Sequence, residues 1–127
     1  MKWGVRRYQN PDGTLTELGS KRYSRQSNKF SRLEKQLTKK EYRLNKQQHK
    51  FQDTIKRATL SDFSYEAKRT QSAKLSKAYR SYIKTGKKFV RNYEQMLKRY
   101  GFNNMSSYEV TKGREYTQRY LKNIGTI

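Results

Sequence analysis

The sequence has 127 residues, with 31 Lys and Arg against 10 Asp and Glu, and its formal net charge is +21. Cysteine is absent, which excludes a disulfide framework, a thiolate metal site and a thiol nucleophile. No apolar run approaches the length of a membrane span, and we expect neither a span nor a signal peptide, so the protein is expected to act inside a cell or a particle assembled there.

The first 23 residues differ in composition from the rest and are predicted to form a separate N-terminal element. Residues 10–13 (Asn-Pro-Asp-Gly) have strong turn chemistry, because Pro presets φ, Asp hydrogen-bonds locally and Gly accepts a positive φ. Thr16 followed by Glu17 has the pattern of a helix N-cap. We therefore expect a small β-hairpin or tight loop that leads into a short helix.

A long helix is predicted over residues 27–58. Apolar residues recur there at spacings of three, four and seven, which is the repeat of one helix face. The stripe is narrow, as in a coiled-coil seam, and consists of Phe30, Leu33, Leu37, Leu44, Phe51, Ile55 and Ala58. Residues 59–62 interrupt the pattern and offer new N-caps.

A second long helix is predicted over residues 62–100, with Gly101 at the position of a C-terminal helix stop. Several tyrosines lie on its apolar face, and their spacing favours packing between helices over a ladder for stacking bases. The stripe is Leu75, Ala78, Tyr82, Phe89, Tyr93, Met96, Leu97 and Tyr100.

A third, shorter helix is predicted to begin at the capping-box pair Ser106 and Glu109 and to end at Gly125. The predicted fold is thus mostly α: a long helical hairpin plus a short C-terminal helix, with a small N-terminal β-hairpin or loop element. We divide the chain into an N-terminal element, residues 1–23, and a basic helical-hairpin domain, residues 24–127. Neither long helix has enough apolar surface to be stable alone, so the seams could also form a homodimer.

Catalysis is not expected. His49 has only Asp53, four residues on, as a nearby second ligand or carboxylate partner, so we interpret it as a solvated surface residue. The carboxylates are scattered singly near cations, which predicts lowered pKa values and intrahelical ion pairs, not paired acids. No phosphate-binding Gly loop, nucleophile elbow or zinc spacing is present. We expect a protein that is not an enzyme and has no cofactor or metal.

The charge imbalance favours a polyanionic partner, either nucleic acid (DNA or RNA) or a ribonucleoprotein. A solvated helix face normally balances Lys with Glu, and here the acids are too few. Two clusters, each within about two helical turns, could follow phosphates, although each alone could also be a face that only keeps the protein soluble. The residues expected to contact phosphate are Lys39, Lys40, Arg43 and Lys46 on the first helix and Lys84, Lys87, Lys88 and Arg91 on the second.

A compact aromatic and basic group lies beside the N-terminal turn. Arg6 and Arg7 are predicted to contact nucleic acid, whereas Trp3 is interpreted as a core residue. The opposite reading, in which the group stacks on bases as a whole, remains open.

The N-terminal sequence resembles a short element of phage and prophage proteins of Gram-positive bacteria, often encoded near head and other structural genes. The resemblance rests on KWGVRRYQN at residues 2–10, DGTLT at residues 12–16, Gly19 and KRY at residues 21–23. It covers the first 23 residues, implies a protein of a mobile element, and carries over no catalytic residue.

This resemblance leads to two hypotheses of different classes. The first is a virion- or head-associated accessory protein, in the virion interior, that contacts packaged DNA or a phage structural protein. The alternative is an anti-CRISPR or other counter-defence protein, in the host bacterial cytoplasm, that binds an RNA-guided host nuclease or its guide RNA. A sequence-specific DNA-binding regulator ranks below both, because no helix-turn-helix with the required short turn is recognisable.

Overall fold

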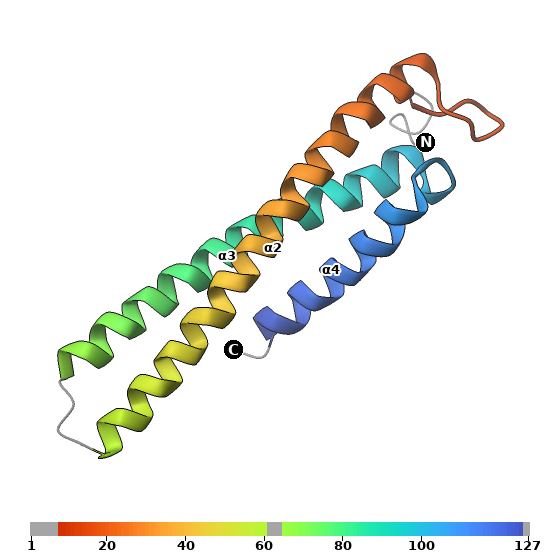
Figure 1. The fold of residues 1–127 in the computed structure, drawn as a ribbon. Helices are drawn as coiled ribbons and strands as arrows, with labels where there is room; N and C mark the ends of the chain where they lie inside the picture. The colour runs from red at the N-terminus through yellow and green to blue at the C-terminus, as the bar shows by residue number, and fades with distance from the viewer. Residues whose placement is uncertain (1–7, 61–64, 126–127) are drawn as a thin grey trace. The chain divides into compact units, whose positions relative to one another are not determined.

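The computed structural model describes residues 8–60 and 65–125, without the side chains of residues 58–60, 65 and 66. Within these residues the chain is mostly α-helical, and the predicted long hairpin followed by a short C-terminal helix is confirmed (Figure 1). The elements are α2 (Glu17–Leu60), α3 (Tyr65–Tyr100), the 3-10 helix η1 (Phe102–Asn104) and α4 (Ser107–Gly125).

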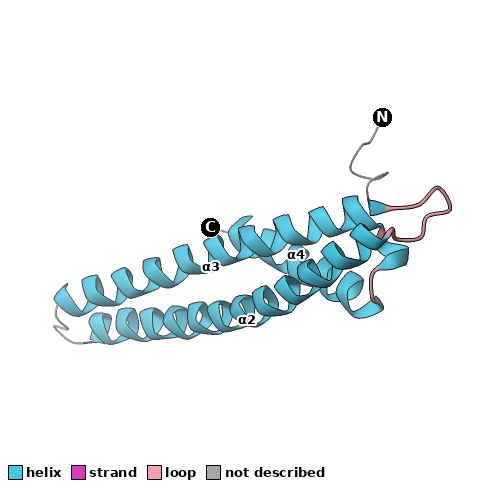
Figure 2. Cartoon of the chain, turned by 90° about the horizontal axis from the view of Figure 1, so that it is seen from above, coloured by secondary structure: helices cyan, strands magenta, loops and turns pink. Residues whose placement is uncertain are grey.

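The N-terminal element has no extended strand in its described part, and Figure 2 shows a loop before α2 begins. The predicted turn at residues 10–13 is present: Gly13 has a φ of 91°, and its N–H donates to the Asn10 carbonyl at 2.9 Å. An isolated antiparallel bridge joins Gln9 to Leu15. Of the two predicted alternatives, the described residues therefore form a loop.

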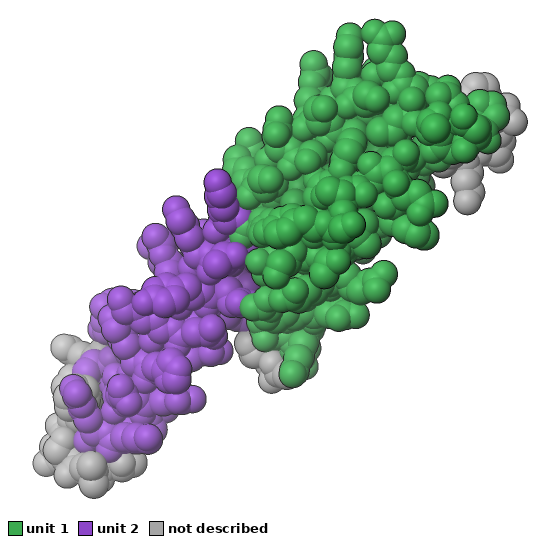
Figure 3. Space-filling model, turned by 45° about the vertical axis from the view of Figure 1, so that its right-hand side comes forward, with its two compact units in different colours: residues 1–34, 86–127 green, residues 35–85 purple. Residues whose placement is uncertain are grey.

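The chain divides into two compact units, which are coloured separately in Figure 3. Unit 1 consists of Met1–Glu34 and Gly86–Ile127, and unit 2 is Lys35–Thr85. Both α2 and α3 contribute to each unit, whereas α4 belongs to unit 1 alone. The predicted division after residue 23 falls inside α2.

Unit 1 contains a core of aromatic and aliphatic side chains from α2, α3 and α4. The rings of Phe30 and Phe89 lie 5.0 Å apart between centroids, and the rings of Phe89 and Tyr116 meet in a T-shaped arrangement with 5.7 Å between centroids. Tyrosines thus pack between helices here, as predicted. The buried apolar residues of this unit are Tyr8, Phe30, Leu33, Phe89, Tyr93, Met96, Tyr100, Met105 and Tyr120.

Unit 2 has a much thinner core. Its buried apolar side chains, among those described, are Leu37, Leu44 and Tyr82. Three residues after Leu44 the contact between α2 and α3 is polar. There the side-chain amide of Gln71 donates to the side-chain carbonyl of Gln47 at 2.7 Å. Further along α2, Phe51 of the predicted seam is half-buried, whereas the prediction for Ile55 is wrong, because Ile55 is 41% exposed. The side chain of Ala58 lies outside those described.

The start of α2 differs from the prediction. The short helix and the first long helix are one continuous helix from Glu17, and Thr16 is its N-cap, with the Gly19 N–H donating to Thr16 Oγ1 at 3.0 Å. The first turns of α2 face the rest of unit 1 with polar groups, since Gln26 Oε1 accepts from the Tyr100 hydroxyl and from Arg99 Nη1. An apolar repeat is consequently absent from this part of the helix.

The predicted helix boundaries near residue 100 are confirmed. α3 ends at Tyr100, and Gly101 has a φ of 75°, in the left-handed region that favours glycine. Ser106 and Glu109 form the reciprocal capping box of α4. The Glu109 N–H donates to Ser106 Oγ at 3.1 Å, and the Ser106 N–H donates to Glu109 Oε1 at 3.3 Å.

Two glycines allow α4 to approach α3 closely. A Cβ on Gly86 of α3 would lie 2.1 Å from Cε1 of Tyr120, and a Cβ on Gly113 of α4 would lie 2.2 Å from Cε1 of Tyr93. Each helix therefore inserts a tyrosine ring over a glycine of the other. The Tyr93 hydroxyl also donates to the Val110 carbonyl at 3.1 Å, which fixes the position of α4 along α3.

Candidate nucleic-acid interface

The predicted cluster on α2 lies in unit 2. Lys39, Arg43 and Lys46 are exposed and follow one another at spacings of four and three, so they share one face of the helix. Lys40 differs: it follows the buried Leu37 by three residues and is half-buried at the edge of the seam. Three of the four predicted cations on α2 therefore project from a common face.

The predicted cluster on α3 is divided between the units, with Lys84 in unit 2 and Lys87, Lys88 and Arg91 in unit 1. All four are exposed. The helix contains no Asp or Glu over residues 67–93. Within unit 2 this acid-free stretch exposes further cations that sequence reasoning did not select, namely Lys68, Arg69, Lys74, Lys77 and Arg80.

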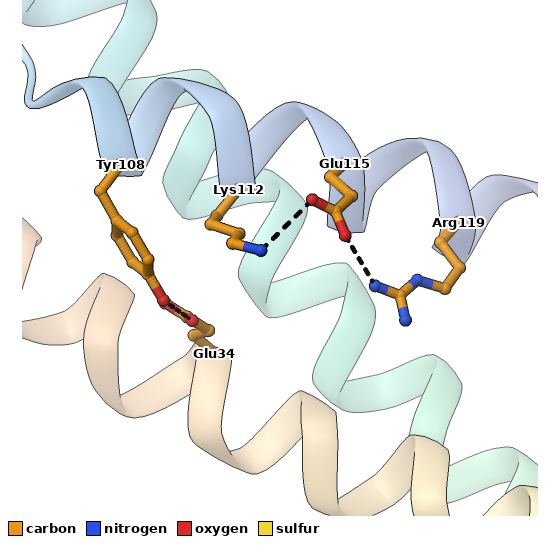
Figure 4. A network of polar contacts seen from close by, with 5 residues as sticks. All are labelled: Glu34, Tyr108, Lys112, Glu115 and Arg119. Atoms are coloured by element: carbon orange, nitrogen blue, oxygen red, sulfur yellow. Dashed lines mark hydrogen bonds and ion pairs between the residues drawn. The ribbon is translucent and has the colours of Figure 1, made fainter.

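The eight predicted cations on α2 and α3 differ from those of α4 in their ion pairing. Within the described part of the chain, none of the eight contacts a carboxylate. α4 shows the opposite arrangement (Figure 4): Glu115 accepts from Lys112 at 3.5 Å and from Arg119 at 3.2 Å. Intrahelical ion pairs were predicted for the acids in general, and this one is confirmed.

Other carboxylates accept hydrogen bonds from hydroxyl groups. The Tyr108 hydroxyl of α4 donates to Glu34 of α2 (Figure 4), and this contact raises the pKa of Tyr108 to about 12. In the N-terminal turn the Thr14 hydroxyl and N–H donate to Asp12 at 2.7 and 3.0 Å and lower the pKa of Asp12. The prediction that nearby cations lower these pKa values is wrong for Asp12, because hydrogen bonds from Thr14 do so.

Glu109 is the most buried carboxylate among the described residues, at 4% exposure. Burial alone would raise the pKa of Glu109. Hydrogen bonds from Ser27, Tyr23 and Ser106 outweigh burial and leave the pKa below its ordinary value of 4.5. For Tyr23, the burial of its own hydroxyl and the hydrogen bond to Glu109 raise the pKa to about 12. A carboxylate whose oxygens are occupied in this way serves to fix α4 to α2 and is poorly suited to proton transfer.

Two open surface hollows lie in unit 2, and each is bordered by cations. The hollow on α3 has a volume of about 380 Å³ and is lined by Arg69, Thr70, Ala73, Lys74 and Lys77. The hollow on α2 has a volume of about 420 Å³ and is lined by Tyr42, Asn45, Lys46, His49, Lys50 and Asp53. Among the residues that line the two hollows, Lys46 was predicted from the sequence to contact phosphate. The absence of acids on α3 could have identified the first hollow, and an aromatic residue off the seam could have identified the second.

The N-terminal aromatic and basic group is described only at Tyr8, because Trp3, Arg6 and Arg7 lie outside the described residues. Tyr8 is buried, meets the Tyr100 ring at 5.8 Å between centroids, and lies under the Arg99 guanidinium at 5.4 Å. Tyr8 is therefore a packing residue of unit 1.

The motif that resembles the phage element closes one end of unit 1. A Cβ on Gly19 would lie 2.1 Å from the Tyr8 carbonyl oxygen, so glycine is required where the chain crosses the start of α2. The Gln9 amide donates to the Arg99 carbonyl at 2.9 Å, in the last turn of α3. The Asn104 amide donates to the Gly13 carbonyl at 2.7 Å. These motif residues thus have a structural role of their own.

Among the described residues, no group of three or more His, Cys, Asp or Glu could hold a metal ion. His49 is exposed, as predicted. No helix in the described ranges is long and apolar enough to cross a membrane. Comparison with protein-family models, with curated proteins and with solved structures finds no match to this chain.

Proposed function

We propose that this protein is a non-enzymatic accessory protein that binds nucleic acid through exposed basic faces, chiefly those of unit 2. The observation that carries the proposal is the stretch of α3 over residues 67–93, which contains no Asp or Glu and exposes a series of Lys and Arg side chains. In unit 2 this stretch is accompanied by the exposed face of Lys39, Arg43 and Lys46 on α2.

A polyphosphate is the partner that fits these faces best. Successive cations at spacings of three and four residues form a line of charge along a helix, and a nucleic-acid backbone presents a line of opposite charge. Each phosphate that is neutralised releases counterions, which gives a favourable entropy that unpaired surface cations in solvent do not provide. The net charge of +21 would strengthen the attraction over a longer range at low salt.

The biological setting that we propose is phage-derived, on the strength of the N-terminal resemblance. A virion- or head-associated protein would use its basic faces on packaged DNA, with sequence playing no part in recognition. The alternative is an inhibitor of an RNA-guided nuclease, which would bind guide RNA or the ribonucleoprotein. The resemblance to an element encoded near head genes places the first role ahead of the second.

The interface is tested by removing charge from α3 of unit 2 and, separately, from α4. The variant Lys77→Ala, Arg80→Ala, Lys84→Ala should bind a duplex DNA more than tenfold more weakly at 150 mM salt, a concentration we set at about the physiological value. The slope of log affinity against log salt should fall by about 0.9 for each lost phosphate contact. Fluorescence anisotropy over a salt series measures both quantities, and circular dichroism checks that helix content is retained.

The matched control is Lys112→Ala, Arg119→Ala, Lys122→Ala, which removes the same formal charge from α4. Two of these cations already pair with Glu115, so the loss of affinity should be much smaller. Equal losses in the two variants would mean that attraction is diffuse and that α3 is not the interface.

Co-purification from phage-infected or expressing cells at moderate salt distinguishes the two settings. Recovery of heterogeneous DNA or capsid components supports the virion-associated role. Recovery of one stoichiometric nuclease with its guide RNA would replace it with the inhibitor role.

A further inference from the structure

Tyr42 is the most exposed large apolar side chain among those described, at 69%. Elsewhere in unit 2, Tyr82 is 1% exposed and lies in the seam, and Tyr79 is half-buried. Tyr42 comes two residues before the buried Leu44 and therefore points away from the seam, towards the basic face of α2. Its ring does not contribute to the core of the hairpin.

The residues around Tyr42 form one continuous helix face. Asn45 and Lys46 follow it at three and four residues, and His49 and Lys50 follow at seven and eight, so all lie on the same side of α2. They border the open hollow of about 420 Å³, with Asp53 at its far end. With a rise of about 1.5 Å per residue, Tyr42 and His49 lie roughly 10 Å apart along the helix axis.

The chemistry of this face excludes two ordinary explanations. A protein-docking site would surround Tyr42 with other apolar side chains, whereas its neighbours in the hollow are an amide, two lysines, an imidazole and a carboxylate. A metal site would need more ligands than His49 and Asp53 supply. An exposed aromatic ring flanked by cations is the arrangement that proteins use to bind single-stranded nucleic acid.

We propose that this face of α2 binds unpaired bases of a single-stranded nucleic acid. Tyr42 stacks on a base, Lys46 and Lys50 bind the phosphates on either side, and the Asn45 amide hydrogen-bonds the edge of the stacked base. In a duplex the bases are already stacked on one another, so a single-stranded segment gains a contact that a duplex cannot make. The inference rests on the proposed function and deepens it, because it names the form of nucleic acid that this face selects.

The test compares a labelled single-stranded oligo-deoxythymidine with a duplex of the same length by fluorescence anisotropy. Tyr42→Ala should weaken binding of the single strand by about five- to 150-fold, which corresponds to the loss of one stacked base. Binding of the duplex should stay within about twofold of the wild type, a margin we set well below the loss of one stacked base. The salt slope for the single strand should not change, because no charge is removed.

Three further variants distinguish the contribution of the Tyr42 ring to binding from the contributions of its hydroxyl, of a neighbouring cation and of exposed tyrosines in general. Tyr42→Phe keeps the ring and should bind the single strand as the wild type does. Lys46→Ala should lower the salt slope by about 0.7, the value for one phosphate of a single strand. Tyr108→Ala is the matched control, because Tyr108 is 54% exposed but contacts Glu34, and it should leave binding unchanged.

Each result is decisive. If the wild type binds neither oligonucleotide at low salt, the proposed function fails and this inference fails with it. If the wild type binds but Tyr42→Ala has no effect, or weakens single strand and duplex equally, nucleic-acid binding stands and the base-binding face is overturned.

Discussion

Glu109 lies in the first turn of α4, where it completes the capping box and joins α4 to α2. Its carboxylate accepts from Ser27 Oγ at 2.6 Å, from Ser106 Oγ at 3.0 Å and from the Tyr23 hydroxyl. None of these donors is charged, so the negative charge is stabilised by hydrogen bonds alone. The capping box was predictable from the spacing of Ser106 and Glu109, whereas the donors from α2 were not, because they are 82 and 86 residues away in sequence.

Replacing this carboxylate tests its role. Glu109→Gln places an amide NH₂ among hydroxyl and N–H donors and should lower the free energy of unfolding by about 1–3 kcal/mol at pH 7. Urea denaturation followed by circular dichroism measures the change. Glu115→Gln on the same helix is the control; its side chain is 47% exposed, and we expect a change within about 0.5 kcal/mol.

The pH dependence of stability should also change. The pKa of Glu109 in the folded protein lies below its ordinary value of 4.5, so its ionised form adds stability above about pH 4.5. This contribution is lost as the pH falls through the lowered pKa. Stability measured from pH 6 downwards, a range we choose to bracket that pKa, should therefore fall more steeply for the wild type than for Glu109→Gln. If stability depended on pH equally in the wild type and in Glu109→Gln, the lowered pKa of Glu109 would be contradicted.

At the scale of helices, sequence reasoning succeeded where the packing is apolar and failed where it is polar. The stripes through Leu33 and Met96 and the stop at Gly101 were predicted, because apolar periodicity and glycine chemistry are local signals. The helix start at Glu17 was predicted, but the continuity of α2 through residues 17–27 was missed, because Gln26 meets α3 through hydrogen bonds and not through an apolar repeat. The exposure of Ile55 was missed too, because its spacing of four residues from Phe51 continues the apolar repeat.

From the packing of α4 on α3 through Gly86 and Gly113 we predict effects of alanine substitution that are opposite to those expected from helix propensity. Alanine favours a helix interior over glycine by about 1 kcal/mol, yet Gly86→Ala and Gly113→Ala should each destabilise the protein by about 1–3 kcal/mol. The reason is that the new Cβ would overlap the ring of Tyr120 or Tyr93. Thermal or urea unfolding shows whether each substitution lowers or raises the free energy of unfolding.

A control and a rescue complete this experiment. Gly125→Ala adds a Cβ that meets no atom within 4 Å at the end of α4 and should be neutral or slightly stabilising. In a double-mutant cycle, Tyr120→Ala should relieve most of the cost of Gly86→Ala, since it removes the ring that the new Cβ would strike. Additive effects would show that the glycine is needed for another reason.

At the scale of the whole molecule, the formal charge of +21 opposes compactness. The predicted cations of α2 and α3 lie off the apolar stripes in the sequence, and all of them except Lys40 are exposed. The acid-free stretch of α3 could also have been predicted from the sequence. Sequence alone could not predict which cations pair with acids or which residues border a common hollow, because both depend on side-chain positions in three dimensions. Arg69 and Tyr42 were missed even though the absence of acids on α3 and the position of Tyr42 off the seam are signals in the sequence, because those signals do not show which neighbours share a hollow with them.

The charge predicts a stability that increases with salt. Raising ionic strength from about 0.01 M to about 0.15 M shortens the screening length from about 30 Å to about 8 Å. The melting temperature should rise by roughly 2–8 °C for each kcal/mol of repulsion that is screened. The variant Lys77→Ala, Arg80→Ala, Lys84→Ala should show a smaller rise in the same calorimetric series. A melting temperature that falls with salt would mean that attractive ion pairs outweigh repulsion.

Unit 1 is assembled from two stretches of chain that flank unit 2, and this order has a consequence for biosynthesis. A ribosome releases residues up to 34 first, but their partners on α3 and α4 emerge only after the whole of Lys35–Thr85. The contacts of unit 2 join neighbouring parts of the sequence, so its two helical segments can meet before Tyr120 of the larger core has been made. During translation the thin core of unit 2 is therefore expected to gain its main support only when the last helix emerges, after the faces proposed to bind nucleic acid have already been made.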